Sequence, residues 1–387
     1  MTRVRISDVA REAGVSLGTV SNAINHPERV RADTRQLINE AIDRLGYLPN
    51  QTARLLAGGV NAVIGLVLPR LNHGCSLQIA NGARNEAHRA GYDLVIMNTD
   101  DDEEVERRYL RFCIGMQLAG VLVQPSTYRV PQPARTLPVP VVYLSAPDVP
   151  DEALSVSADY AAQGRLIAEH VLAHGARHIA VVGEALRPPL AQRLQGVRTV
   201  AAIHPEASFE VINEGKRYGS SDGAKLGMRL AQRGVRSRPQ AIIALADTIA
   251  AGVIAGVQAA GCSVPDDIMV AGCDGNPLAW GGTVPLTTCS PAGYEIGRKG
   301  VQMLVAQIEA SREAEELERT SAAWPGMANA PSTTAPQIAE TIENVHELVR
   351  PFLLERASTV GEDAGRQHAR LGTSVGSIPE LDMGSYL

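Results

Sequence analysis

From residue 61 onward, short runs of consecutive apolar residues alternate with longer amphipathic stretches. Such runs are typical of strands buried on both faces of a parallel sheet, with the intervening helices covering those faces. The runs form two sets: Val63–Leu68, Leu94–Met97, Val121–Val123 and Val139–Leu144, then Ile179–Val182, Phe209–Ile212, Ala241–Leu245 and Ile268–Ala271. We therefore predict an α/β body of two lobes, each a doubly wound and mainly parallel sheet, facing each other across a small-molecule site.

The amphipathic stretches between these runs predict helices that complete each lobe. We expect them at 76–90, 103–117, 159–174, 189–202, 220–233, 248–260 and 293–309. The chain is expected to cross between the lobes near 145–160 and again near 287–293.

A different pattern precedes this body. Apolar residues recur at helical spacing over 6–13, and Gly14 suits the left-handed residue that ends a helix. Ser16 follows as a candidate cap of the next helix. A helix, a short turn and a second helix predict a helix-turn-helix, and residues 33–45 supply a third amphipathic helix for its core.

The second of these helices has one face suited to reading DNA. Its outward residues are mostly short and carry little charge: Leu17, Gly18, Ser21, Asn22 and Asn25. Ser16 and Thr19, which can cap the helix, are predicted DNA contacts as well. Asparagine bonds adenine edges, leucine contacts the thymine methyl group, and hydroxyls bond phosphates. The face predicts sequence-specific binding to double-stranded DNA. The alternative is a small amphipathic hairpin that serves as a docking surface.

Charge and composition agree with this division of the chain. Residues 1–60 carry eight arginines and six acidic residues, whereas the whole chain of 387 residues has a formal net charge of −6. This excess points the N-terminal segment toward DNA, and it is small enough that affinity should depend on dimerisation. Without a membrane-spanning apolar run or a signal-peptide pattern, the chain is expected to be cytoplasmic. The five scattered cysteines suit reduced, buried thiols.

Motifs for catalysis are not found in the sequence. The nine histidines have no metal-ligand spacing, and the chain lacks a GxSxG nucleophile elbow, a CxxC pair and a P-loop lysine. We therefore predict no enzyme activity, no cofactor and no metal site. The acidic run at 100–104 suggests either a cation site or a capped helix start. The second is favoured because carboxylates stabilise a helix N-terminus.

The C-terminal segment, 321–387, loses the strand pattern and begins with a stretch rich in Pro, Ala, Ser and Thr. Apolar residues then recur at heptad-like spacing, at Ile338, Ile342, Val345, Val349 and Phe352. This spacing predicts an amphipathic helix at 336–350, which either packs on its own subunit or joins subunits into a tetramer. Residues 357–387 are polar and glycine-rich, and we expect them to be disordered.

Several motifs at fixed spacing carry a family resemblance. They are Asp8-Val-Ala, Ala13-Gly-Val-Ser, Thr19-Val-Ser, Leu45-Gly-Tyr and Leu56-Ala-Gly. This run resembles the DNA-binding region of the lactose-repressor (LacI/GalR) family. The resemblance implies a helix-turn-helix domain at 1–48 and a hinge helix at 49–60 that folds when two subunits meet on DNA. Leu56 would then be a wedge in the minor groove, with burial in the linker as the alternative.

Arg29, Asn50 and Ala53 complete the predicted set of DNA contacts.

The resemblance continues through 61–320, which looks like the family's effector domain, similar to periplasmic binding proteins. It implies that Arg193 hydrogen-bonds a small-molecule effector, that Tyr218 stacks on it, and that Asp247 and Asp274 contact it. The alternative for these residues is a salt bridge between helices or a loop cap. Further candidates for the effector site are Asn72, Ser126 and Trp280.

Three departures from the family pattern concern this effector site. Ala246 stands where Asn commonly precedes the aspartate, Gly275 where a second aspartate follows, and Ser145-Ala146 where Asp-Arg often ends the fourth strand. They indicate either a changed effector, less polyhydroxylated than a pyranose, or a reduced dependence on effector.

These patterns together predict a homodimeric transcriptional repressor that binds a near-palindromic operator, one half-site per subunit. A carbohydrate or related small molecule bound between the lobes is expected to relieve repression. The alternatives are a solute-binding protein without DNA activity, and a protein that uses the helix-turn-helix to dock a partner.

Overall fold

The computed structural model describes residues 4–25, 27–47, 61–71, 74–127, 138–146, 148–184, 188–213, 219–276, 282–322 and 346–361. The chain divides into two compact units, Met1–Ala62 and Val63–Leu387, and each unit is described by itself.

In its described residues, the first unit is a bundle of three α-helices, α1 (Ile6–Ala13), α2 (Leu17–Asn25) and α3 (Ala32–Leu45). Each helix contributes a fully buried side chain to one small core: Val9, Val20 and Ile38. Burying an aliphatic side chain of this size stabilises the fold by about 2 kcal/mol, and no single helix could bury it alone. The predicted helix-turn-helix with a supporting third helix is confirmed.

The turn between α1 and α2 follows the predicted punctuation. Gly14 ends α1 in the left-handed region, at φ 66°. Ser16 caps α2, since its hydroxyl accepts a hydrogen bond from the backbone N–H of Thr19 at 3.1 Å. The short 3-10 helix η1 (Pro27–Arg29) then leads into α3, which ends at a second left-handed glycine, Gly46.

The second unit contains two six-stranded sheets, one in each lobe. The first lobe holds a fully parallel sheet in the order β11-β5-β4-β3-β1-β2. Its strands are β1 (Val63–Leu68), β2 (Asp93–Asn98), β3 (Gly120–Val123), β4 (Val141–Leu144), β5 (Leu154–Ala158) and β11 (His346–Val349). Helices α5 (Gly74–Arg89) and α11 (Gly293–Ala322) cover one face, and α6 (Glu103–Gly115) covers the other.

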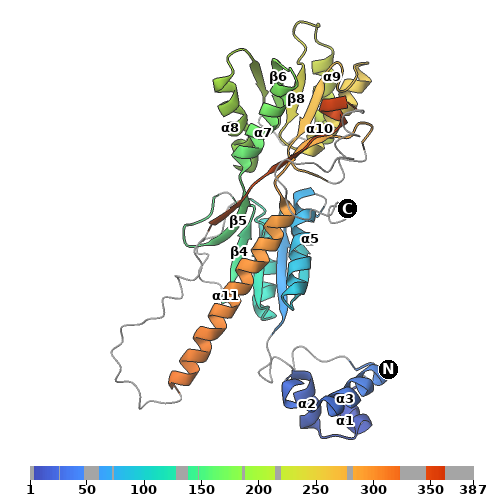
Figure 1. The fold of residues 1–387 in the computed structure, drawn as a ribbon, viewed down its shortest axis with the longest axis vertical. Coiled ribbons are helices and arrows are strands. Elements are labelled where there is room, and N and C mark those ends of the chain that lie inside the picture. Colours follow the sequence, from blue (N-terminus) through green and yellow to red (C-terminus); the bar gives the residue numbers. More distant parts are fainter. Residues whose placement is uncertain are drawn as a thin grey trace, which may run out of the picture. The chain divides into compact units, whose positions relative to one another are not determined.

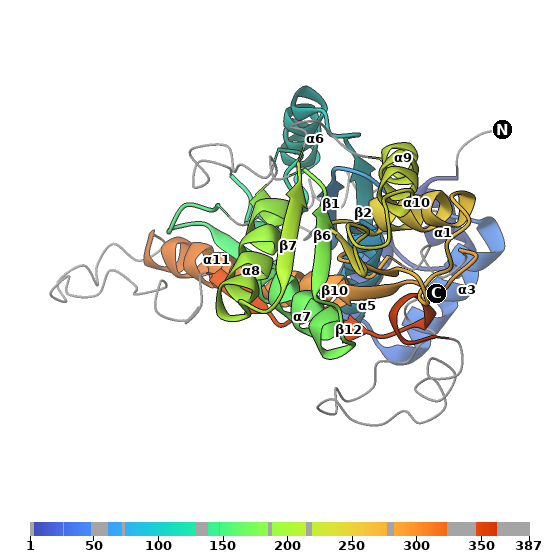
Figure 2. The same cartoon turned by 90° about the horizontal axis from the view of Figure 1, so that it is seen from above.

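The second lobe has the strand order β12-β10-β9-β8-β6-β7, in which only β12 is antiparallel. Its strands are β6 (His178–Val182), β7 (Ser208–Ile212), β8 (Ala241–Ala244), β9 (Met269–Gly272), β10 (Thr287–Ser290) and β12 (Phe352–Leu354). Alternate residues of β6 face opposite layers. One layer is built by α7 (Tyr160–Ala173) and α8 (Pro188–Ile203), the other by α9 (Ser220–Ala231) and α10 (Asp247–Ala259) (Figure 2).

Within the described ranges, the chain passes between the two sheets three times (Figure 1). Two passages, from β5 to α7 and from β10 to α11, were predicted. The third runs from β11 in the first sheet directly to β12 in the second, and the sequence pattern did not predict it. The C-terminal segment therefore completes one edge of each sheet, and the α/β body extends past residue 320 to at least residue 361.

The predicted helix at 336–350 is wrong over His346–Val349, which form strand β11 beside β5. Phe352, the last residue of the proposed apolar stripe, likewise begins strand β12. Pairing with the free edges of two sheets satisfies the backbone of this segment, and that tertiary gain overrides a short heptad-like pattern. Ile338, Ile342 and Val345 lie outside the described residues.

The expectation of disorder from residue 357 is also wrong at its start. Residues 357–361 form a helical turn in which Ser358 and Thr359 are buried. Ser358 donates to the Val270 carbonyl at 2.6 Å and accepts from the Thr287 N–H at 2.8 Å. These polar residues order the turn because they satisfy buried backbone groups of β9 and β10.

None of the helices in the described ranges combines the length and the apolar composition that crossing a bilayer requires.

Candidate functional site

The predicted DNA-reading face is exposed on α2. Leu17 is 52% exposed although it is apolar, and Gly18 and Asn22 are also exposed. Val20, on the side of the helix opposite Gly18 and Asn22, is fully buried. An exposed leucine next to a glycine and an asparagine leaves α2 with a surface that closely approaching base edges can contact.

Two of the three hydroxyl residues among the predicted DNA contacts have a local role as well. Ser16 and Thr19 share a hydrogen bond of 2.8 Å between their side chains while Ser16 caps the helix. Ser21 is half-buried and Arg29 is exposed at the end of η1. The side chain of Asn25 lies outside the described residues, as do Asn50, Ala53 and Leu56 in full.

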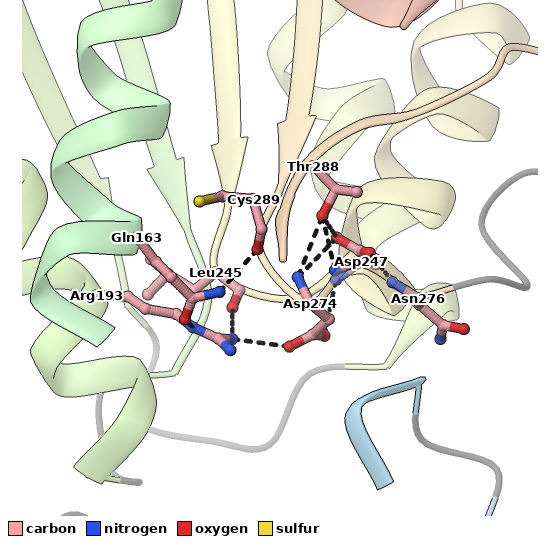
Figure 3. A network of polar contacts seen from close by, with 9 residues as sticks. Gln163, Arg193, Leu245, Asp247, Asp274, Asn276, Thr288 and Cys289 are labelled. Atoms are coloured by element: carbon pink, nitrogen blue, oxygen red, sulfur yellow. Dashed lines mark hydrogen bonds and ion pairs between the residues drawn. The ribbon is translucent and has the colours of Figure 1, made fainter. Parts of the chain in front are cut away.

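In the second lobe, residues from several elements meet at the carboxyl ends of the strands (Figure 3). Asp247 is the first residue of α10, directly after β8, and Asp274 follows β9. Arg193 reaches them from α8. Doubly wound sheets gather side chains at this edge because every parallel strand ends there.

The Asp247 carboxylate is held by donors from the neighbouring loop and strand. The N–H of Asn276 donates to Asp247 Oδ2 at 2.7 Å, and the Thr288 hydroxyl donates to Asp247 Oδ1 at 2.6 Å. Burial, followed by the negative charge of Asp274, raises the pKa of Asp247 to about 7. Two carboxylates and one guanidinium therefore share a site only 1–3% exposed.

Arg193 is fixed on several sides. Its Nη1 donates to Asp274 Oδ1 at 2.9 Å and to the Leu245 carbonyl at 2.7 Å, and its Nε donates to Gln163 Oε1 at 3.0 Å. The guanidinium lies over the Tyr160 ring, 5.4 Å from its centroid. Burial by itself would lower the pKa of Arg193, but the nearby Asp274 carboxylate raises it overall, so the side chain stays charged.

The structure brings together three of the predicted effector residues, Arg193, Asp247 and Asp274. They bind one another: Arg193 of α8 forms an ion pair with Asp274 in the loop after β9, and the Asp247 carboxylate accepts from the Asp274 N–H. The ion pair thus joins a helix to a loop, whereas the alternative considered was a salt bridge between helices. Contact between these three residues and an effector stays a prediction. Asn72, Tyr218 and Trp280 lie outside the described residues.

Ser126 belongs to a different cluster, in the first lobe. Its N–H donates to Glu106 Oε2 at 2.7 Å, and its hydroxyl is bonded to Thr99 at 2.7 Å. Burial raises the pKa of Glu106. Ser126 therefore lies at the carboxyl edge of the first sheet, and its hydrogen bonds are to residues of its own lobe.

Two glutamines of the site were not predicted. Gln163 of α7 contacts Arg193, and Gln78 of α5 joins the two lobes by donating to the Gly275 carbonyl at 2.6 Å and accepting from the Gly293 N–H at 3.1 Å. A lone glutamine inside a helical pattern carries no signal of a long-range partner. These two residues could be found only from the fold.

One departure from the family pattern has a local explanation. Gly275 lies in the left-handed region, at φ 59°, and a Cβ there would come within 2.6 Å of the Ser290 side chain. An aspartate could not occupy this backbone without strain and a clash.

Comparison with known proteins connects both units to one group. Residues 5–50 match the family described as bacterial regulatory proteins, lacI family, and residues 168–324 match a periplasmic binding protein-like domain. Catabolite control protein A of Priestia megaterium is 30% identical over 308 residues, which cover 78% of this chain and 91% of that protein. The ribose operon repressor of Halalkalibacterium halodurans is 29% identical over 310 residues, 80% of this chain and 91% of that repressor.

Solved structures show the same fold. The lac repressor dimer bound to operator and the anti-inducer ONPF has a TM-score of 0.70 at 23% identity, covering 92% of this chain and 99% of that one. A complex of the regulator CelR with cellobiose has a TM-score of 0.60 at 23% identity, covering 92% and 100%.

Proposed function

This chain belongs to the lacI family of bacterial regulatory proteins, and on that premise we propose that it represses transcription from a near-palindromic operator under control of a neutral small molecule. The exposed face of α2 is the observation that carries the DNA-binding half. A leucine that is 52% exposed on an otherwise well-packed helix suits contact with a partner surface.

Base recognition is assigned to Leu17, Gly18 and Asn22, which are exposed together. Ser16, Thr19, Ser21, Asn25 and Arg29 lie around them in the chain and are assigned to phosphates. In the hinge, we propose that Asn50 and Ala53 contact DNA and that Leu56 wedges into the minor groove. Leu56→Ala should then reduce operator bending, measured by the mobility of permuted DNA fragments. Equal bending in wild type and variant would refute the wedge.

A second copy of the chain is proposed to cover exposed apolar residues at the sheet edges. Val95 and Ile96 on β2 are 42% and 40% exposed, and β2 ends the first sheet. Val211 on β7, which ends the second sheet, is 38% exposed. Two subunits on one palindrome double the phosphate contacts, which a DNA-binding segment with only two excess positive charges requires. The heptad-like stripe is not helical over 346–349, so a dimer is proposed and no tetramer.

The effector is proposed to bind at the carboxyl ends of the second-lobe strands, beside Arg193 and Asp274, and to be a carbohydrate or related molecule. The buried ion pair supports this assignment, and so do the relatives named for ribose and cellobiose. An effector that lowers operator affinity tenfold must bind two states of the protein, one that binds operator and one that does not, with binding free energies that differ by about 1.4 kcal/mol.

A DNA-binding experiment tests this function. Operators are first selected from random duplexes, and affinity is then measured by fluorescence anisotropy at several salt concentrations. D-ribose, cellobiose and D-xylulose are screened by thermal shift, and every binder is added to the operator assay. Absence of sequence preference would favour a solute-binding or docking protein. A sugar that binds tightly but leaves operator affinity unchanged would contradict the proposal that an effector controls DNA binding.

This role includes no catalysis, and it places the protein with the chromosome, in the cytoplasm.

A further inference from the structure

We propose that Gln163 is a positioning residue of the effector site, because it holds the Arg193 guanidinium so that only the two N–H groups of Nη2 remain for a ligand. This inference rests on the proposed function, since it concerns how that site would recognise its effector.

Gln163 is fully buried in α7, and both ends of its amide are engaged. Its Nε2 donates to the Cys289 carbonyl at 2.7 Å, and its Oε1 accepts from Arg193 Nε at 3.0 Å (Figure 3). The first bond decides the second. A carbonyl accepts and cannot donate, so the amide must turn its NH₂ group to Cys289 and its oxygen to Arg193.

Two glycines allow this contact between α7 and α8. A Cβ on Gly164 would overlap the Arg193 carbonyl oxygen, and a Cβ on Gly196 would overlap the Ala161 carbonyl oxygen. The helix backbones therefore lie close enough for the Gln163 side chain to reach Arg193 Nε.

The hydrogen bonds of Arg193 leave one nitrogen over. Nε has one N–H, which goes to Gln163, and Nη1 has two, which go to Asp274 and Leu245. Within the described part of the chain, Nη2 has no hydrogen-bond partner, although the Arg193 side chain is only 4% exposed. A guanidinium nitrogen with two remaining donors, on a side chain that is otherwise almost wholly buried, is a recognition point for an acceptor.

The position of the remaining donors restricts the ligand. Arginine binds carboxylates and phosphates through two parallel N–H groups, supplied by neighbouring nitrogens. Both such pairs of Arg193 include a nitrogen whose hydrogens are already used, and the two N–H groups of Nη2 diverge. Arg193 therefore suits single acceptor atoms, such as hydroxyl, carbonyl or ring oxygens, and not a bidentate oxyanion. The adjacent Asp274 carboxylate also repels an anion.

Nuclear magnetic resonance of ligand-free protein with ¹⁵N-labelled arginine tests the positioning. The signal of Arg193 is assigned by its loss in Arg193→Lys. In wild type, the Nε–H should be protected from exchange with water. Gln163→Met keeps the side-chain volume but removes the acceptor, and the exchange rate should rise at least tenfold. Gln163→Glu keeps an acceptor for Arg193 Nε but loses the donor to the Cys289 carbonyl, so its rate should lie between those of wild type and Gln163→Met.

Two further variants keep the result interpretable. Gln163→Asn withdraws the amide by one methylene and should also raise the exchange rate, so the test survives if Gln163→Met does not fold. Gln195→Met changes an exposed glutamine on the same helix as Arg193 and should leave the rate unchanged. An unchanged rate in both Gln163→Met and Gln163→Asn would overturn the positioning role.

The effector measurement is separate. For any sugar found by the thermal-shift screen, Gln163→Met should weaken binding about tenfold, and a phosphorylated form of that sugar should bind more weakly than the neutral form. Unchanged sugar affinity in a variant whose Arg193 signal has changed would overturn the role, and tighter binding of the phosphate would overturn the ligand class. A screen without any binder counts against the proposed effector, whereas the exchange rates still decide the role of Gln163.

Discussion

Asp247 and Asp274 form reciprocal hydrogen bonds between the backbone of one residue and the side chain of the other. The N–H of Asp247 donates to Asp274 Oδ2 at 3.1 Å, and the N–H of Asp274 donates to Asp247 Oδ1 at 3.2 Å. The two residues are 27 positions apart in sequence. Their reciprocal bonds join the loops after β8 and β9, so the position of one carboxylate depends on the other. The Arg193 guanidinium is bonded to Asp274 of this pair.

The stability of the second unit should depend on the protonation of Asp247. Its pKa is raised from 3.8 to about 7, so the folded protein retains a proton that the unfolded chain has lost. Stability from this group is complete below pH 4 and is lost as the pH rises to 7. The stability of wild type relative to Asp247→Asn should fall by roughly 1 kcal/mol per pH unit in this window, measured by urea denaturation.

The stability of wild type is compared with that of Asp247→Asn because His170 also changes its protonation in this pH range. Burial and His174 lower its pKa to about 4, so its contribution to stability is lost as the pH falls below 6.5. This slope has the opposite sign and cancels when wild type and Asp247→Asn are compared at each pH. A difference that does not change between pH 4 and 7 would contradict the buried, proton-retaining state of Asp247.

Removal of the charge partner of Arg193 should be costly. Asp274→Asn removes the carboxylate that is hydrogen-bonded to a guanidinium with a 4% exposed side chain, and we expect a loss of about 3 kcal/mol in the free energy of unfolding. Asp267→Asn is the matched control, because Asp267 is 40% exposed and lies 3.7 Å from Arg238. That surface pair should contribute less than about 1 kcal/mol. Equal losses in both variants would show that the Arg193 site is not sealed from water.

Close packing of α7 on α8 should not tolerate a methyl group at Gly164. The added Cβ would overlap the Arg193 carbonyl, so the helices must separate, and Gly164→Ala should cost about 2 kcal/mol. Gly115→Ala meets no atom within 4 Å and should be neutral or slightly stabilising. Thermal unfolding of both variants checks the contrast, and a neutral Gly164→Ala would mean that the helices lie further apart than described.

Side chains of α2 should separate base recognition from folding. Asn22→Ala removes an exposed amide and should reduce discrimination at one or two operator positions by about 1–3 kcal/mol, with the helical content unchanged. Val20→Ala instead creates a cavity in the core of the three-helix unit and should lower its melting temperature. Competition with single-base operator variants and circular dichroism distinguish the two effects. Unchanged discrimination at every operator position in Asn22→Ala would remove Asn22 from the reading face.

The local pattern of the sequence was sufficient for most elements. Glycines at 14 and 46 end two helices as predicted. The apolar runs of the second unit are strands, because they are too short for helices and lie between amphipathic helical stretches. Helix α11 was predicted to end near 309 and continues to Ala322, because no glycine or proline interrupts that stretch. The C-terminal strands were missed, because a segment that only completes sheet edges carries the pattern of neither a buried strand nor a loop.

The amino-acid sequence by itself determined the helix-turn-helix, the two-sheet body and the identity of the charged residues, since each depends on local spacing and residue type. It named Arg193, Asp247 and Asp274 but not what they bind. The tertiary structure decided that Arg193 and Asp274, 81 residues apart, form an ion pair, and that Gln163 occupies the guanidinium Nε. Such partners are set by the approach of distant backbones, which glycines at 164 and 196 permit and which no local pattern encodes.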